Sequence, residues 1–253
     1  MAAISMLPPS LSLWHQRFAH HSIPSLKQLI SRKLVKGLHI EPVVSSDLDP
    51  ICEPCLAGKM NASPFPSSFY NTTMPLELVH SDLHQLKSPT WDGYKYWITF
   101  IDDFTHFVVV ILLKTKSQAL TAFQHFKSFA ETRTGHKLIA LQDDKGGEYM
   151  SNAFQEFCAS SGVHRRHSTR NRLQQNSVAE RANRTLQEHC TAMLYQANLP
   201  ASFIGECVQA YVYSWNMIPH SSSSQTTPYT LWYCSKPDVS RLRVFGCIAY
   251  VHV

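Results

Sequence analysis

Apolar segments of strand character come first in the larger part of the chain, and helical patterns follow them. The strand segments are Leu76–Leu83, Tyr96–Asp102 and Phe107–Leu113, rich in β-branched, aromatic or leucine residues. Later segments alternate: a helix from Ala119 to near Gly135, a strand at Leu138–Leu141, a short helix closing at Gly162, a strand around Val163–His167, and helices near 176–197 and 201–217. This order predicts an α/β fold, with a mixed sheet covered by helices on its faces.

A breaker-rich stretch over residues 61–75, NASPFPSSFYNTTMP, divides the chain into two parts. Its prolines, serines and asparagines fit neither a helix nor a central strand. We therefore expect a small domain over residues 1–60, a linker, and a larger domain over residues 76–253. In the small domain, Ser25 is the expected N-cap of a helix and Gly37 its expected stop.

Charge and hydropathy narrow the class of protein only a little. The chain has 23 Lys and Arg against 18 Asp and Glu, a net charge of +5, which is compatible with a polyanionic partner without requiring one. Apolar runs such as Phe107–Leu113 fall far short of the ~20 residues of a membrane span. The first residues lack the basic and apolar regions of a signal peptide. We expect a soluble, unsecreted protein without a membrane partner.

Four residues of the small domain have the spacing of metal ligands: His15, His20, Cys52 and Cys55. Zn²⁺ takes four nitrogen or sulfur ligands, and a C-x-x-C turn supplies two of them. A domain of this size has too little core to fold reliably unaided, so one structural Zn²⁺ is expected. His21 and His39 compete with His20, and the bland alternative is two unrelated histidines near a stray C-x-x-C.

Acidic residues follow two of the expected strands and begin one expected helix. Asp82 closes the first strand, Asp143 and Asp144 follow the strand after the long helix, and Glu180 lies near the start of the next long helix. If the two strands are neighbours, their carboxyl ends meet where open α/β sheets place their sites. Such carboxylates can hold two Mg²⁺ or Mn²⁺ ions ~3.5–4 Å apart for in-line displacement at phosphorus.

Other acids of the same region remain candidates on pattern alone. Asp102 and Asp103 also follow a strand, and the pattern does not exclude them. Glu148 follows Asp144 too closely to reach the site from another element, so a turn or capping role is expected for it. Asp143 should point to the opposite face of its strand from Asp144.

Eight motifs together point to a known family: LWHQRFAH, CEPCLAGK, HSDL, FIDDFTHFVVVILLKTKSQA, LQDDKGGEY, QQNSVAERANRTL, TTPYTLWY and RVFGCIAYV. In this order they resemble the GAG-pre-integrase zinc (HHCC) region and integrase core of a copia-type LTR retrotransposon Pol polyprotein, over nearly the whole chain. The resemblance implies an RNase H-like mixed sheet of five strands, preceded by a small helical zinc-binding domain. It also implies a D, D-x35-E triad, and 35 residues separate Asp144 from Glu180, so Asp82, Asp144 and Glu180 are the implied catalytic and Mg²⁺-binding residues.

The function that the resemblance implies is DNA integration. Such a polynucleotidyl transferase joins the 3′ ends of element DNA to target DNA with two Mg²⁺ (or Mn²⁺) ions. The implied partners are element and target DNA and further copies of the chain. The implied location is the nucleus, with cytoplasmic element particles.

A basic stretch over residues 163–176 is expected to bind the phosphates of a nucleic acid through Arg165, Arg166, Arg170 and Arg172. The resemblance adds Gln175, Asn176, Asn183 and Arg184 as DNA contacts. The alternative, with no role in binding, is a solvated basic loop.

Two other functions remain open beside integration. Lys145, Gln142, Leu173 and Ser177 depart from the family's usual residues, and without protease or reverse transcriptase motifs we expect a truncated copy. The first alternative is therefore a catalytically inactive nucleic-acid-binding remnant, or a recruited zinc and DNA interaction module. The other, a nuclease acting on RNA–DNA hybrids, is disfavoured by the zinc unit and the 35-residue spacing.

Overall fold

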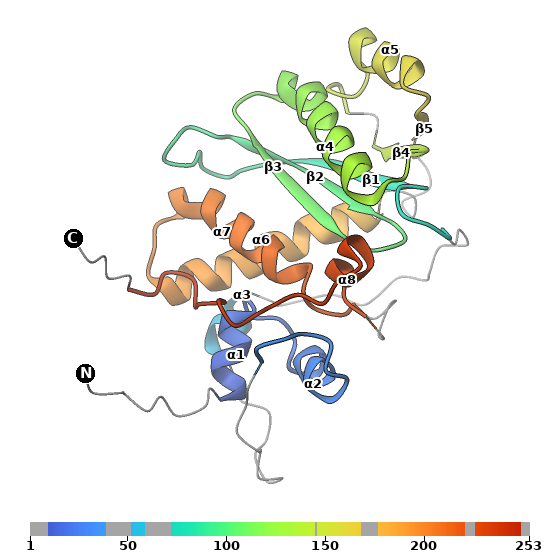
Figure 1. Cartoon of the computed structure of the whole chain (residues 1–253). Coiled ribbons are helices and arrows are strands. Elements are labelled where there is room, and N and C mark those ends of the chain that lie inside the picture. The colour runs from blue at the N-terminus through green and yellow to red at the C-terminus, as the bar shows by residue number, and fades with distance from the viewer. Residues whose placement is uncertain are drawn as a thin grey trace, which may run out of the picture.

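A mixed β-sheet forms the centre of the larger domain (Figure 1). The computed structural model describes residues 10–38, 52–58, 72–144, 146–167, 177–220 and 226–248. Within these residues five strands form one sheet in the order β3-β2-β1-β4-β5. They are β1 (Val79–Gln85), β2 (Tyr96–Asp102), β3 (Val108–Leu113), β4 (Ala140–Asp143) and β5 (His164–His167). β1, β2 and β3 pair antiparallel, while β4 pairs parallel to both β1 and β5, which confirms the predicted mixed sheet.

Helices cover both faces of this sheet, as Figure 1 shows. One face carries α4 (Ala119–Thr134), α5 (Asn152–Ser160) and α8 (Pro228–Tyr233), and the other carries α6 (Ser177–Ala197) and α7 (Ile204–Trp215). Short 3-10 turns at Lys116–Gln118 and Ala201–Phe203 precede α4 and α7.

The interior strand β2 shows why two helical layers are needed. Ile98 and Phe100 point into the α4 side, whereas Trp97 and Ile101 point into the α6 side. Successive side chains of a strand face opposite sides, so a strand that is apolar on both faces must be covered on both. On the α4 side the rings of Phe100 and Phe126 stack with centroids 4.4 Å apart.

The strands β1 and β4 begin later than the sequence predicts. Leu76 has a left-handed backbone (φ 65°), and its N–H donates to Oδ1 of Asp102 at 2.7 Å. That turn delays entry into β1 to Val79. The predicted and observed bounds of β2 agree.

The small domain contains α1 (Leu11–Arg17), α2 (Ile23–Ser31) and α3 (Glu53–Gly58). The expected N-cap Ser25 is wrong, because the hydroxyl of Ser22 accepts from the N–H of Ser25 and α2 begins before it. Gly37 does not stop this helix, which ends six residues earlier at Ser31. Instead Gly37 (φ 79°) passes close to Ser240, where a Cβ atom would lie 2.7 Å from the Cβ of Ser240.

The small domain and the C-terminal residues share one hydrophobic cluster, called here the closing cluster. Its buried members are Trp14, Phe18, Leu26, Leu29, Met217, Ile218, Val239 and Leu242. A β-bridge between Lys36 and Asp238 joins the same two regions. The small domain therefore packs onto the larger one through a common core. No helix in the described residues is both long and apolar enough to cross a membrane.

Candidate active site and metal centre

The three predicted acids come from neighbouring elements on one side of the sheet. Asp82 is the fourth residue of β1, Asp144 directly follows β4, and Glu180 lies in the first turn of α6. β1 and β4 are parallel neighbours with His80 opposite Gln142, and two more residues along that register bring Asp82 beside Asp144. The predicted adjacency of the two strands is therefore confirmed.

Asn183 connects the helix of Glu180 to the strand of Asp82. Its Nδ2 donates to Oδ2 of Asp82 at 2.7 Å. Its Oδ1 accepts from Nε1 of Trp97 at 2.9 Å and from Oγ1 of Thr99 at 2.6 Å. The side chain is buried, and both ends of its amide have partners inside the protein. Instead of the DNA contact expected from the sequence, the structure gives Asn183 the role of orienting Asp82.

The electrostatics of Asp82 show that the three carboxylates act on one another. The pKa of Asp82 is raised to about 6, chiefly by burial and also by the charges of Asp144 and Glu180, against the opposing hydrogen bond from Asn183. An arrangement of oxygen ligands that repel each other suits a hard divalent cation such as Mg²⁺, which removes the repulsion.

Asp82→Asn should stabilise the metal-free protein at neutral pH. The pKa of Asp82 is higher in the folded protein than in the unfolded chain. Deprotonation of Asp82 therefore lowers the free energy of unfolding as pH rises from about 4 to 6, and this loss persists at higher pH. We expect a gain on the order of 2 kcal/mol at pH ~7.5 in a chelator, falling toward zero near pH ~4. Urea unfolding of both proteins at the two pH values measures it.

The matched control is Asp92→Asn, at an exposed turn. It should change the free energy of unfolding by less than about 0.5 kcal/mol. Added Mg²⁺ should narrow the difference between wild type and Asp82→Asn, because only the carboxylate gains from the ion. A variant that is no more stable than wild type in chelator would show that neither burial nor repulsion makes the ionised carboxylate of Asp82 unfavourable.

Asp143 faces the interior and has a positive partner of its own. Nε and Nη2 of Arg165 donate to Oδ2 of Asp143 at 3.1 and 2.7 Å, and Nη1 donates to the carbonyl oxygen of Tyr149 at 2.6 Å. The Asp143 side chain is 0% exposed and that of Arg165 9%. The two adjacent aspartates thus have different roles, Asp143 in a buried ion pair and Asp144 at the site. Arg165, expected from the sequence to contact DNA, is engaged inside the protein.

The remaining acidic candidates have structural partners. Asp102 accepts from the N–H of Leu76 and from both the N–H and hydroxyl of Thr105, at 2.6 to 2.8 Å. Asp103 accepts from Nε2 of His80 at 2.8 Å. Asp102 therefore links the β2–β3 turn to the chain before β1, and Asp103 links that turn to β1 itself.

Glu148 lies in the turn after Asp144, as expected. A Cβ atom added to Gly146 would lie 2.7 Å from Oε1 of Glu148 and 3.1 Å from Oδ1 of Asp144. The N–H of Gly146 donates to Oδ1 of Asp144 at 2.9 Å. The absence of a side chain at Gly146 thus leaves room for both carboxylates.

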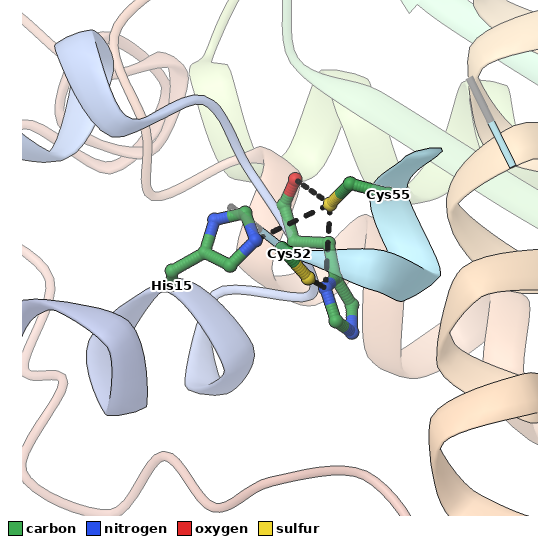
Figure 2. A group of neighbouring side chains, drawn as sticks. His15, Cys52 and Cys55 are labelled. Carbon is green, nitrogen blue, oxygen red and sulfur yellow. Dashed lines mark hydrogen bonds between the residues drawn. The ribbon is translucent and has the colours of Figure 1, made fainter. Parts of the chain in front are cut away.

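The zinc-type ligands come together in the small domain: His15, His20, Cys52 and Cys55. Their ligand atoms all lie within 4.8 Å of one another, and the quartet is the one such group of His, Cys, Asp and Glu in the described part of the chain. Cys55 Sγ lies 3.3 Å from His15 Nε2 and 3.5 Å from His20 Nδ1. Figure 2 shows the side chains of His15, Cys52 and Cys55 pointing toward one another.

The outer nitrogens of both histidines are held in the way that metal-binding histidines require. Nδ1–H of His15 donates to the carbonyl oxygen of His21 at 2.6 Å, and Nε2–H of His20 donates to Oε1 of Gln196 at 2.5 Å. These bonds fix the tautomers, so that the lone pairs of His15 Nε2 and His20 Nδ1 face the cysteines. Two thiolates and two such imidazoles fit a tetrahedral Zn²⁺.

The other predicted DNA contacts fall into two groups. Arg166 lies on β5 and is half-buried, and Arg184 is exposed on α6, one turn after Glu180. The second group lies outside the described residues: Arg170, Arg172, Gln175 and Asn176.

Comparison with protein families defines the class. Residues 72–172 match the family model of the integrase core domain, and residues 2–60 match that of the GAG-pre-integrase domain. The chain thus matches a GAG-pre-integrase domain followed by an integrase core domain, in the order that the motifs predict.

Relatives identify the larger family. The chain is 38% identical over 248 residues to the retrovirus-related Pol polyprotein from transposon TNT 1-94 of Nicotiana tabacum, a match that covers 96% of this chain and 18% of the relative. It is 30% identical to that from transposon RE1 of Arabidopsis thaliana, over 94% of this chain and 16% of the relative. Along nearly its whole length the chain is similar to transposon-derived, retrovirus-related Pol polyproteins, and it spans less than a fifth of the length of these relatives.

Solved structures with a similar fold include the HTLV-2 integrase catalytic core domain in complex with magnesium. The two share 22% sequence identity with a TM-score of 0.49, and the match covers 64% of this chain and 99% of that chain.

Proposed function

We propose that this chain is the zinc domain and catalytic core of a copia-type retrotransposon integrase. Its reaction joins DNA 3′ ends to target DNA by two-metal phosphoryl transfer. The observation that carries the proposal is the position of Asp82, Asp144 and Glu180 on β1, β4 and α6, with Asn183 orienting the first of them. The family relationship makes polynucleotidyl transfer the expected chemistry of such a site.

The carboxylates would hold two Mg²⁺ or Mn²⁺ ions, which activate the attacking 3′-hydroxyl oxygen and stabilise the leaving oxygen. Asp82 is the best-fixed ligand, because Asn183 and the β-ladder set its orientation. Asp144 follows a buried strand end that the Asp143–Arg165 ion pair holds in place. Glu180 comes from the exposed side of α6, where substrate DNA has access.

Basic residues beside these acids are proposed to bind the DNA backbone. Arg184 lies one turn after Glu180 on α6, Arg166 lies on β5 opposite Gln142 of β4, and further basic residues follow β5 in the sequence of residues 168–176. Contacts of this kind hold phosphates irrespective of base sequence and weaken as salt rises. One structural Zn²⁺ would be held by His15, His20 and the two cysteines of the quartet. A homo-oligomer acting in the nucleus, with cytoplasmic element particles, completes the proposal.

A strand-transfer assay tests the function. The purified chain is mixed with short labelled duplexes and a supercoiled plasmid, in Mg²⁺ or Mn²⁺. Label should become covalently joined to the plasmid, and chelation of the divalent ions should abolish joining. Salt-sensitive DNA binding without any joining in either metal would contradict the proposal and support the inactive, nucleic-acid-binding alternative.

A further inference from the structure

The residues that form hydrogen bonds to the histidines of the quartet do not all belong to the small domain. The outer nitrogen of His20 donates to Gln196, a residue 176 positions away in the last turn of α6. This is the helix whose first turn carries Glu180. α3, which carries Cys55, also packs against α6. One helix therefore carries an acid of the active site at one end and contacts a predicted zinc ligand at the other.

The other histidine of the quartet, His15, is connected to the larger domain through His21. The carbonyl oxygen of His21 accepts from His15, and the ring of His21 stacks on Tyr211 of α7 with centroids 5.3 Å apart and planes 8° from parallel. Beside it, Nδ1 of His189 on α6 donates to the carbonyl oxygen of Ala19 at 2.7 Å. The residues on either side of the ligand His20 thus rest on α6 and α7.

The backbone of this segment is itself strained. Ala19 and His20 have positive φ angles of 51° and 61°. Residues with side chains adopt this conformation only where their surroundings enforce it. Here the contacts to His189 and Gln196 provide that enforcement, so the geometry of His20 depends on its docking against α6.

We propose that Gln196 is a positioning residue of the zinc site, and that zinc binding and docking of the small domain on α6 are coupled through it. The inference rests on the zinc-binding part of the proposed function. Without the acceptor Oε1, the ring of His20 is free to rotate or change tautomer, and its Nδ1 no longer points to the cysteines. Linkage makes the effect mutual, since a contact that tightens zinc binding is tightened by zinc to the same extent.

Zinc affinity of the full chain provides the first test. Gln196→Met removes the acceptor at similar volume, Gln196→Glu keeps it, and Tyr195→Met is the matched control at an exposed neighbour on the same helix. Affinity is measured by competition with a chromophoric chelator. We expect about 10- to 100-fold weaker binding for Gln196→Met, and binding within a few-fold of wild type for the other two.

The zinc affinities of the three variants and the Co²⁺ spectrum of wild type decide between the possible outcomes. Equal affinities of Gln196→Met and Tyr195→Met would overturn the inference, and so would a loss of more than about tenfold in Gln196→Glu. The glutamate variant keeps the test decisive if the methionine variant does not fold. Co²⁺ loading of wild type should give the thiolate charge-transfer and tetrahedral d–d bands of a two-sulfur, two-nitrogen site. Their absence would overturn the zinc part of the proposed function itself, whereas equal affinities overturn the role of Gln196 alone.

Hydrogen exchange tests the coupling. Removal of zinc from wild type should speed amide exchange in the last two turns of α6 at least about tenfold and leave β2 and β3 unchanged. In Gln196→Met the same segment should exchange quickly with zinc present at a concentration that saturates wild type. Exchange of α6 that does not respond to zinc in wild type would overturn the coupling.

Discussion

Glu180→Gln is expected to lower the rate of DNA joining by roughly a thousandfold or more, which corresponds to about 4 kcal/mol on the barrier. An amide has the size of the carboxylate but no charge, so it cannot compensate the positive charge of a divalent ion. Glu180 is exposed in the first turn of α6, so the change should leave the fold intact. DNA binding should also persist, because the basic side chains that grip phosphates are untouched. Joining is measured in the strand-transfer assay, and binding by fluorescence anisotropy at several salt concentrations.

The matched control for Glu180→Gln is Glu188→Gln, the same chemical change two turns further along α6. It should join DNA at the wild-type rate. If both variants joined equally well, Glu180 would not be a ligand of the catalytic ions. Glu148, which lies near Asp144 around Gly146, would then be the carboxylate to test next.

Arg165→Met is expected to destabilise the protein by about 3–5 kcal/mol, because it leaves the carboxylate of Asp143 buried without a charge partner. It also removes the donor to the carbonyl oxygen of Tyr149, in the loop that follows Asp144. Urea unfolding at neutral pH, followed by circular dichroism, measures the loss. DNA joining should fall along with stability, since the backbone that carries Asp144 loses its anchor.

A double variant separates the ion pair from general damage. Adding Asp143→Asn to Arg165→Met removes the uncompensated charge, so the double variant should be more stable than Arg165→Met alone. The contrasting control is Lys137→Met, which removes a lysine that is 86% exposed from its ion pair with Glu131. That change should alter stability by no more than about 1 kcal/mol. If Arg165→Met and Lys137→Met lowered the free energy of unfolding equally, burial would add nothing to the ion pair of Asp143 and Arg165.

Strands and helices with a clear hydrophobic period could be predicted from the sequence, and their ends less well. β2 is apolar on both faces, and both of its ends agree with the prediction. The start of α2 was misplaced, because Ser22 and Ser25 both precede apolar residues at helical spacing. Pro24 was the signal that favours Ser22 as the N-cap. Proline is well suited to the first turn of a helix, whereas an N-cap at Ser25 would place Pro24 before the helix.

Spacing was sufficient to name the candidate ligands but not the residues that hold them. The zinc-type quartet and the acids of the site follow from short motifs, whereas Asn183 reaches Asp82 across 101 residues and Arg165 reaches Asp143 across 22. Such pairs depend on the tertiary arrangement, which no local pattern contains. One signal was available for Arg165. Strand alternation turns Asp143 inward, and an inward carboxylate needs a cation from a neighbouring strand.

The closing cluster has a consequence for the order in which this chain acquires its structure. Trp14 and Leu26 bury themselves against Val239 and Leu242, residues more than two hundred positions later in the chain. Contacts between such distant segments form late, because the entropy of closing so long a loop is lost before any burial compensates it. A fragment cut between the two domains would therefore expose one half of an unfinished apolar interface on each piece, and aggregation of both pieces is the expected fate.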